Sequence, residues 1–208
     1  MQGPLETDPR FWILSEALAS YASGADDPPA PDPGWLQAAV SVVIRANHGL
    51  DLLLIKRARS ERDPWSGHMA LPGGRRDPAD ASLQVTAVRE TREETGLDLD
   101  VEGVLLGRLE EIKPESVRLP KLTISPFVYG VSAQVKASVA SREVDAVHWI
   151  SLDTLRHPEA HGDVDIPLPG GTRSFPCYRV ADEIVWGLTY RILRQFLERY
   201  PDSRLRAR

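Results

Sequence analysis

The apolar residues of the chain follow different spacings in different stretches, and each spacing predicts one type of element. In residues 8–23 they recur every three or four positions, which predicts an amphipathic helix. The apolar positions of this stretch are Phe11, Leu14, Leu18 and Tyr21. Asp8 precedes Pro9 and is suited to cap the helix. A segment rich in proline, glycine and aspartate follows, so we expect residues 1–34 to form a helical appendage and a linker.

Apolar and β-branched runs beyond this linker predict β-strands. The first two, residues 36–46 and 50–58, are separated by the turn sequence Asn-His-Gly and are expected to pair. Further strands are predicted within residues 100–113, 122–132 and 143–155. The last of them should pass into a short helix that Ser151 caps. The segment SFPCYRV near Cys177 is expected to enter another strand.

Two longer stretches show helical periodicity. The first, residues 80–95, has two alternative caps, Asp80 and Ser82, and ends before Gly96, which suits a left-handed C-cap. The second, residues 181–200, predicts a long amphipathic C-terminal helix. Its apolar stripe consists of Ile184, Leu188, Ile192 and Phe196. A mixed sheet with two substantial helices predicts an α/β or α+β sandwich, which we assign to residues 35–208.

Composition and charge narrow the classes of function. The 208 residues are 42% hydrophobic and 26% charged, as in ordinary globular domains. A net charge of −5 gives no general attraction to a phosphate backbone, so duplex nucleic acid is not an expected partner. The single cysteine, Cys177, and the lack of a long apolar run predict a cytoplasmic protein that does not enter membranes.

Three glutamates lie close together on the helix predicted at residues 80–95. At about 100° per residue, Glu90, Glu93 and Glu94 share one face. In one interpretation this face is solvated, and Arg89 pairs with Glu93 four positions away. In the other, the carboxylates hold a divalent cation. The glycine pair at positions 73–74 favours the second interpretation, because glycines let the backbone approach a ligand closely.

Residues 89–97, RETREETGL, resemble the core of a Nudix box. In the usual pattern a glycine is followed after five residues by a glutamate, and then after seven by Arg-Glu-aliphatic-any-Glu-Glu-any-Gly-aliphatic. Every charged position of the core matches, as do its glycine and its final aliphatic residue. Thr91 departs from the aliphatic position. Asp80 stands for the first glutamate and is followed by eight residues before Arg89.

The loop before the box resembles the coenzyme A pyrophosphatase branch of the Nudix family. The matching residues are Leu53, Leu54, Arg57, Arg62, Gly67, Pro72, Gly73, Gly74, Asp77 and Asp80. The departures are Ile55, Ala58, Leu71 and one additional residue between Arg62 and Gly67. Residues 183–197, EIVWGLTYRILRQFL, are similar to a helix near the end of that branch, so the resemblance runs from about residue 38 to residue 196.

This resemblance implies a Nudix-type α/β/α sandwich that hydrolyses a nucleoside diphosphate linked to another group, with Mg²⁺ or Mn²⁺ as cofactor. Glu90 and Glu94 would be metal ligands, and Glu93 a further ligand or a base. A carbonyl of Gly73 or Gly74 would complete the metal shell. Coenzyme A or its acyl derivatives are the first candidate substrates. The alternatives are other nucleotides, such as NADH, a dinucleotide, a nucleotide sugar or an oxidised nucleoside triphosphate, and a module that binds a nucleotide without cleaving it.

Other charged residues have two interpretations each. By the resemblance, Arg89 would orient Glu93, although a plain surface ion pair is the alternative. Arg57 and Arg62 could bind substrate phosphate or be solvated. Glu143 could be a distal base or an ordinary acid at the end of a strand. The N-terminal helix, through Phe11, Trp12 and Leu14, could serve a homodimer interface.

Overall fold

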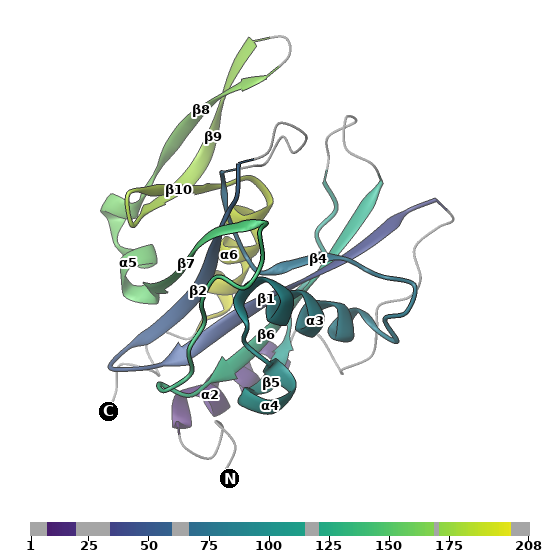
Figure 1. Cartoon of the computed structure of the whole chain (residues 1–208). Coiled ribbons are helices and arrows are strands. Elements are labelled where there is room, and N and C mark those ends of the chain that lie inside the picture. The colour runs from purple at the N-terminus through teal and green to yellow at the C-terminus, as the bar shows by residue number, and fades with distance from the viewer. Residues whose placement is uncertain (1–7, 20–33, 60–66, 115–120, 169–170, 201–208) are drawn as a thin grey trace.

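A mixed seven-stranded sheet forms the centre of the protein (Figure 1). The computed structural model describes residues 8–19, 34–59, 67–114, 121–168 and 171–200. The strands of the sheet are β1 (Leu36–Ala46), β2 (Leu50–Arg57), β3 (Met69–Ala70), β4 (Gly73–Arg75), β5 (Gly103–Arg108), β6 (Leu122–Val131) and β7 (Val144–Ser151). The main order is β3-β2-β1-β6-β5, with β4 paired to β1 and β7 paired to β2. Strands β1 and β6 are parallel, and the other pairs are antiparallel.

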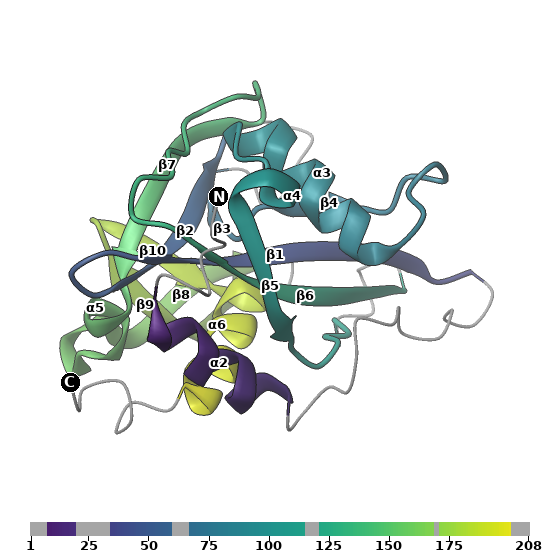
Figure 2. The same cartoon turned by 90° about the horizontal axis from the view of Figure 1, so that it is seen from below.

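Helices cover both faces of this sheet. Helices α3 (Leu83–Thr95) and α4 (Leu99–Glu102) lie on one face, and α2 (Pro9–Ala19) and α6 (Gly187–Arg199) lie on the other (Figure 2). Side chains of a strand point alternately to its two faces. Accordingly, Ala39 and Val43 of β1 join the apolar cluster under α3, whereas Val42 and Ile44 join the cluster under α2 and α6. The predicted α/β/α sandwich with a mixed sheet and an N-terminal helix is confirmed.

Helix α2 belongs to the core. Phe11, Leu14 and Leu18 are buried in the same apolar cluster as the central strands. Two glycines of the sheet make room for it: a Cβ on Gly107 would lie 2.8 Å from the Leu18 Cβ, and one on Gly130 would lie 3.1 Å from the Phe11 ring. The description of this helix as an appendage was therefore wrong. Phe11 and Leu14 are buried within the chain itself, so they are not available for the homodimer interface that this helix could have served.

Local signals in the sequence placed most of the other elements correctly. Strands β1, β2 and β6 lie where the apolar runs predicted them. The Ser82 hydroxyl, and not the Asp80 carboxylate, caps α3 by accepting from the Val85 amide, and Gly96 ends the helix with φ 71°. Ser151 caps the short helix α5 (Leu152–Arg156). Strand β5 is shorter than predicted at both ends: α4 occupies the first residues of that stretch, and the strand ends at Arg108. No helix in the described parts of the chain is long and apolar enough to cross a bilayer.

The C-terminal region differs more from the prediction. Strands β8 (His161–Leu168), β9 (Gly171–Val180) and β10 (Glu183–Trp186) form a second sheet, and the β8–β9 hairpin projects from the body (Figure 1). The single turn η1 (Pro158–Ala160) precedes this sheet. The C-terminal helix begins at Gly187 and not near residue 181. Ala181 and Asp182 have φ values of 50° and 60°, a left-handed turn that lets β10 pair back onto β9.

Candidate active site

Two carboxylates of α3 lie directly against the glycine strand β4. The Gly73 amide donates a 2.9 Å hydrogen bond to Glu94 Oε2. A Cβ on Gly74 would lie 2.4 Å from Glu90 Oε1, so only glycine leaves room for that carboxylate. Gly73 has φ 151°, and a Cβ there would lie 2.3 Å from the Ala39 carbonyl. The glycine pair therefore allows helix and strand to approach closely enough to bring both carboxylates together.

Burial makes the charges of these two carboxylates costly. Glu94 is only 5% exposed. Burial raises its pKa to about 7; the Gly73 amide opposes the shift, and the charges of Glu90 and Glu143 add to it. Burial also raises the pKa of Glu90, and the Arg89 guanidinium opposes this shift. A cation bound between Glu90 and Glu94 would offset both effects.

Arg89 contacts three acidic side chains at once. Its Nε and Nη2 each lie 3.0 Å from an oxygen of Asp80. Its Nη1 donates to Glu90 Oε1 at 3.0 Å and to Glu93 Oε2 at 3.1 Å. Nη2 also donates to the Arg75 carbonyl on β4 at 3.3 Å. Both interpretations of Arg89 thus apply in part, because the pair with Glu93 belongs to a network that also holds Glu90.

Asp80 anchors this network from the loop before α3. Its Oδ2 accepts from the Asp77 amide at 3.0 Å and from the Thr86 hydroxyl at 2.9 Å. The bidentate pair with Arg89 is the main reason why the pKa of Asp80 falls to about 2. Despite its shorter side chain and shifted spacing, Asp80 therefore reaches the arginine of the box.

Glu93 differs from its two neighbours because it faces solvent. Its side chain is 57% exposed and accepts a hydrogen bond from Arg89. Within the described residues, no three His, Cys, Asp or Glu side chains are arranged as a group that could hold a metal ion. The donors already together are the Glu90 and Glu94 carboxylates and the backbone of β4. This set fits Mg²⁺, which proteins commonly bind through one or two carboxylates while waters and substrate phosphates complete its shell.

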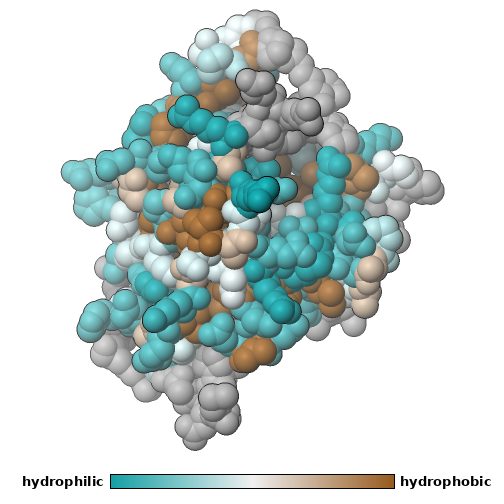
Figure 3. Space-filling view, viewed as in Figure 1, coloured by the Kyte–Doolittle hydropathy of each residue, from teal (hydrophilic) through white to brown (hydrophobic). Residues whose placement is uncertain are grey.

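Arg57 and Glu143 border the carboxylate pair on the side of β2 and β7. The Ala58 amide donates to the Glu143 carbonyl at 2.8 Å, which places Glu143 beside the end of β2. The charge of Arg57 lowers the pKa of Glu94, and that of Glu143 raises it, so both act on the same group. Arg62, the second arginine expected to bind substrate, lies outside the described residues. Hydrophilic side chains cover the part of this face over α3 (Figure 3).

The atypical Thr91 has a polar partner that the sequence analysis missed. Its Oγ1 lies 2.8 Å from Ser41 Oγ and donates to the Ala87 carbonyl at 2.7 Å. Both side chains are buried between α3 and β1. The sequence did contain a signal for this pair. Ser41 interrupts the apolar run of β1, and Thr91 stands at the aliphatic position of the box.

Comparisons with known proteins agree with this fold. A NUDIX domain family model matches residues 35–167. The Nudix hydrolase NudL of Yersinia pestis, described as uncharacterized, is 30% identical over 162 residues, which make up 78% of each chain. An uncharacterized protein of Schizosaccharomyces pombe is 39% identical over 118 residues, 55% of this chain but only 36% of that protein. A crystal structure of a MutT/nudix family protein from Enterococcus faecalis superposes on this chain with a TM-score of 0.56 at 19% identity. The match covers 97% of this chain and 76% of that one, so the two proteins share a fold.

Proposed function

The chain belongs to the Nudix family and is a pyrophosphohydrolase of nucleoside diphosphate-linked compounds, and we propose that its substrate is coenzyme A or an acyl derivative. Hydrolysis would add water across the diphosphate and release 3′,5′-ADP and 4′-phosphopantetheine or its acylated form. The main observation in support of this proposal is a pair of carboxylates, Glu90 and Glu94. They lie against the backbone of Gly73 and Gly74, and Arg57 is close enough for its charge to act on Glu94.

We assign the metal ligands to Glu90, Glu94 and a carbonyl of Gly73 or Gly74. Held by these groups, Mg²⁺ or Mn²⁺ would supply positive charge to the diphosphate and would make a water more acidic for the attack. The chain supplies the geometry: the Gly73 amide fixes one oxygen of Glu94, and Arg89 fixes one oxygen of Glu90. Buried carboxylates held in place in this way lose little freedom when the substrate binds.

The water that attacks phosphorus must transfer a proton to a base. Glu93 and Glu143 are the two candidates. Glu93 lies on the solvent side of the site and accepts from Arg89. Glu143 directly precedes β7 and is close enough to Glu90 and Glu94 for its charge to raise the pKa of both. Replacing each with glutamine separates the two roles, because loss of the base lowers kcat with little change in metal affinity, whereas loss of a ligand weakens metal binding.

The preference for coenzyme A depends on the loop before the box. Arg57 and Arg62 would provide forked donors to the phosphates of the substrate, including the 3′-phosphate that distinguishes coenzyme A from most nucleotides. The location of Arg57 next to Glu94 supports the first of these assignments. We also place the enzyme in the cytoplasm, where coenzyme A and a reduced Cys177 would be expected.

A substrate panel with identification of the products tests the proposal. With Mg²⁺ or Mn²⁺, we expect turnover of coenzyme A to 3′,5′-ADP and 4′-phosphopantetheine. NADH, a dinucleotide, a nucleotide sugar and an oxidised nucleoside triphosphate complete the panel. Turnover of one of these compounds without turnover of coenzyme A would reject the substrate and leave the hydrolase assignment intact.

A further inference from the structure

Three rings meet where the second sheet joins the main one. The indole of Trp186 lies with its centroid 5.1 Å from that of His68, in an edge-to-face arrangement with an interplanar angle of 71°. The Phe175 ring is tilted against the same indole at 5.4 Å. The three residues come from β10, from the segment before β3 and from β9. All three are half-buried, so the cluster lies at a boundary between core and surface.

Trp186 points away from the apolar core. Trp186 is paired with Cys177 across β10 and β9, and Phe175 lies two residues from Cys177, so these side chains share one face of the second sheet. The neighbouring pair, Val185 and Tyr178, faces the other way into the core under α6. The periodicity of residues 181–200 predicted a helix that includes Trp186. Its position in a strand instead directs the ring toward His68.

His68 connects this ring cluster to the active site. The Arg57 amide donates to the His68 carbonyl and the Gly67 amide donates to the Arg57 carbonyl, both at 3.0 Å, so His68 lies opposite Arg57. The charge of Arg57 in turn acts on Glu94. Trp186 therefore contacts the residue that pairs with Arg57 through its backbone.

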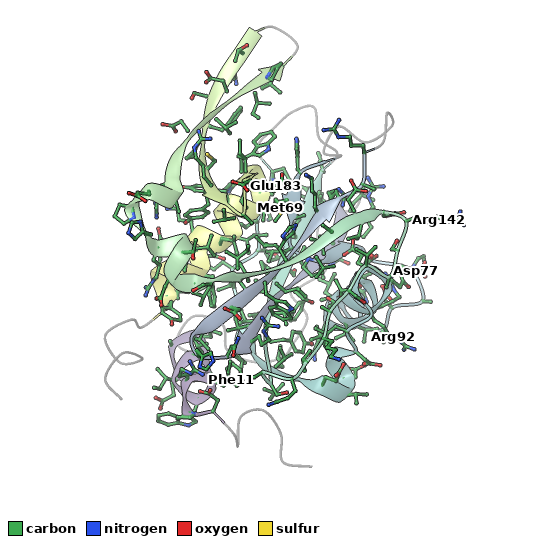
Figure 4. All side chains as sticks on the ribbon, turned by 60° about the vertical axis from the view of Figure 1, so that its left-hand side comes forward. Phe11, Met69, Asp77, Arg92, Arg142 and Glu183 are labelled. Carbon is green, nitrogen blue, oxygen red and sulfur yellow. The ribbon has the colours of Figure 1, made fainter. Side chains whose placement is uncertain are left out.

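An ion pair fixes β10 in this position. Lys56, the residue before Arg57 on β2, pairs with Glu183 of β10. Figure 4 shows the labelled Glu183 close to Met69 of β3, in agreement with the contacts between the two strands. The position of the indole relative to the end of β2 is thus held by this ion pair and by the packing of β10 against β3.

We infer that Trp186 forms the wall of the subsite that receives the planar base of the nucleotide, with His68 and Phe175 holding the indole in place. The inference rests on the proposed function in requiring a nucleotide whose phosphates bind near Glu94 and Arg57, but it does not require that the nucleotide be coenzyme A. A diphosphate held between Glu94 and Arg57 leaves its nucleoside to extend past Arg57, where the indole offers a flat aromatic surface. Every base has a π-face that stacks on such a ring.

Binding of two monophosphates isolates the contribution of the base. AMP and ribose 5-phosphate share the sugar and the phosphate and differ by the adenine, and neither contains a diphosphate to hydrolyse. Their affinities in Mg²⁺ can be measured by calorimetry. For the wild-type protein we expect AMP to bind about tenfold or more tightly than ribose 5-phosphate, in keeping with one stacked base.

Trp186→Met keeps an apolar side chain but removes the flat ring. We expect this variant to reduce the preference for AMP to within about twofold and to leave the affinity for ribose 5-phosphate unchanged. Trp186→Phe, which retains a smaller ring, should recover most of the preference. Trp12→Leu is the matched control, because Trp12 is 59% exposed on α2 and should not affect either affinity.

Three results would overturn the inference. They are a wild type without a preference for AMP, a Trp186→Met variant that retains the preference, and an equal loss of both affinities in Trp186→Met. If Trp186→Met does not fold, the test moves to tryptophan fluorescence. AMP should then quench the wild type but not Trp186→Phe, and quenching that persists in Trp186→Phe would contradict the inference. Coenzyme A is not used in any of these measurements. The substrate panel therefore tests the proposed substrate, and the AMP and ribose 5-phosphate affinities test the Trp186 subsite independently of it.

Discussion

Arg89 and Asp80 form a two-point ion pair in which Nε and Nη2 each lie 3.0 Å from a different carboxylate oxygen. The same guanidinium holds the proposed metal ligand Glu90 through its third nitrogen. The loop before α3 therefore controls the orientation of a carboxylate on the helix. This relationship shows that the unusual spacing of Asp80 preserves contact with the box.

Replacing Asp80 with asparagine should weaken both stability and activity. The uncharged amide cannot accept both nitrogens of Arg89, which leaves a partly buried guanidinium without its main partner. We expect a loss of about 2 kcal/mol in the free energy of unfolding and a fall in kcat of roughly tenfold or more, as Glu90 loses its fixed position. Denaturant titration and steady-state kinetics measure the two effects. Asp145→Asn, at an exposed position, is the control, and an equal effect there would contradict this role.

The stabilisation by Asp80 should disappear in acid. Its pKa is about 2 in the folded protein and about 3.8 when unfolded, so its contribution is complete above pH 4 and is lost as the pH falls toward 2. The difference in unfolding free energy between wild type and Asp80→Asn should therefore shrink by about 2 kcal/mol from pH 5 to pH 2. Urea titrations at a series of pH values test this, and a gap that stays constant over the range would reject the assigned cause.

Glu94→Gln should separate stability from activity. At pH 8 the wild-type carboxylate is buried and charged beside Glu90, so glutamine should raise the free energy of unfolding of the metal-free protein by about 1 kcal/mol. Hydrolysis should fall by about 100-fold or more. Mg²⁺ should raise the thermal midpoint of the wild type and have little effect on the variant. Unchanged turnover in Glu94→Gln would contradict the metal role.

Gly74→Ala should displace Glu90. The added Cβ would lie 2.4 Å from Glu90 Oε1, so the carboxylate must move. We expect weaker Mg²⁺ binding and about a 10- to 100-fold fall in kcat/KM. Gly49→Ala is the matched control, because a Cβ there meets no atom within 4 Å. Calorimetric titration with Mg²⁺ compares the variants, and equal affinities in both would remove the steric explanation.

The buried pair of Thr91 and Ser41 should show energetic coupling. Thr91→Val leaves Ser41 without its partner hydroxyl, and we expect a loss of about 1 to 2 kcal/mol in unfolding free energy. Ser41→Ala should cost a similar amount, whereas the double variant should cost about 1 kcal/mol less than the sum of the two. A double-mutant cycle in urea measures the coupling, and strictly additive effects would mean that the hydroxyls stabilise the protein independently.

The sequence by itself determined the elements whose signals are local. The alternation along β1 and β2, the Ser82 cap and the left-handed Gly96 all involve neighbours a few residues apart, so periodicity and capping predicted them. The Nudix motif likewise lies within a short stretch, which is why the sequence alone was enough to propose Arg89, Glu90 and Glu94 as site residues.

Tertiary structure alone decided the contacts between distant segments. Residues 183–186 carry a helical spacing of apolar positions, but the left-handed turn before them and pairing with β9 make them a strand. The burial of Phe11 depends on a sheet glycine at position 130, and the buried charge of Glu94 on the approach of Gly73. Such contacts form between residues far apart in the chain. Their energies depend on how distant segments pack together, which cannot be read from a short stretch of sequence.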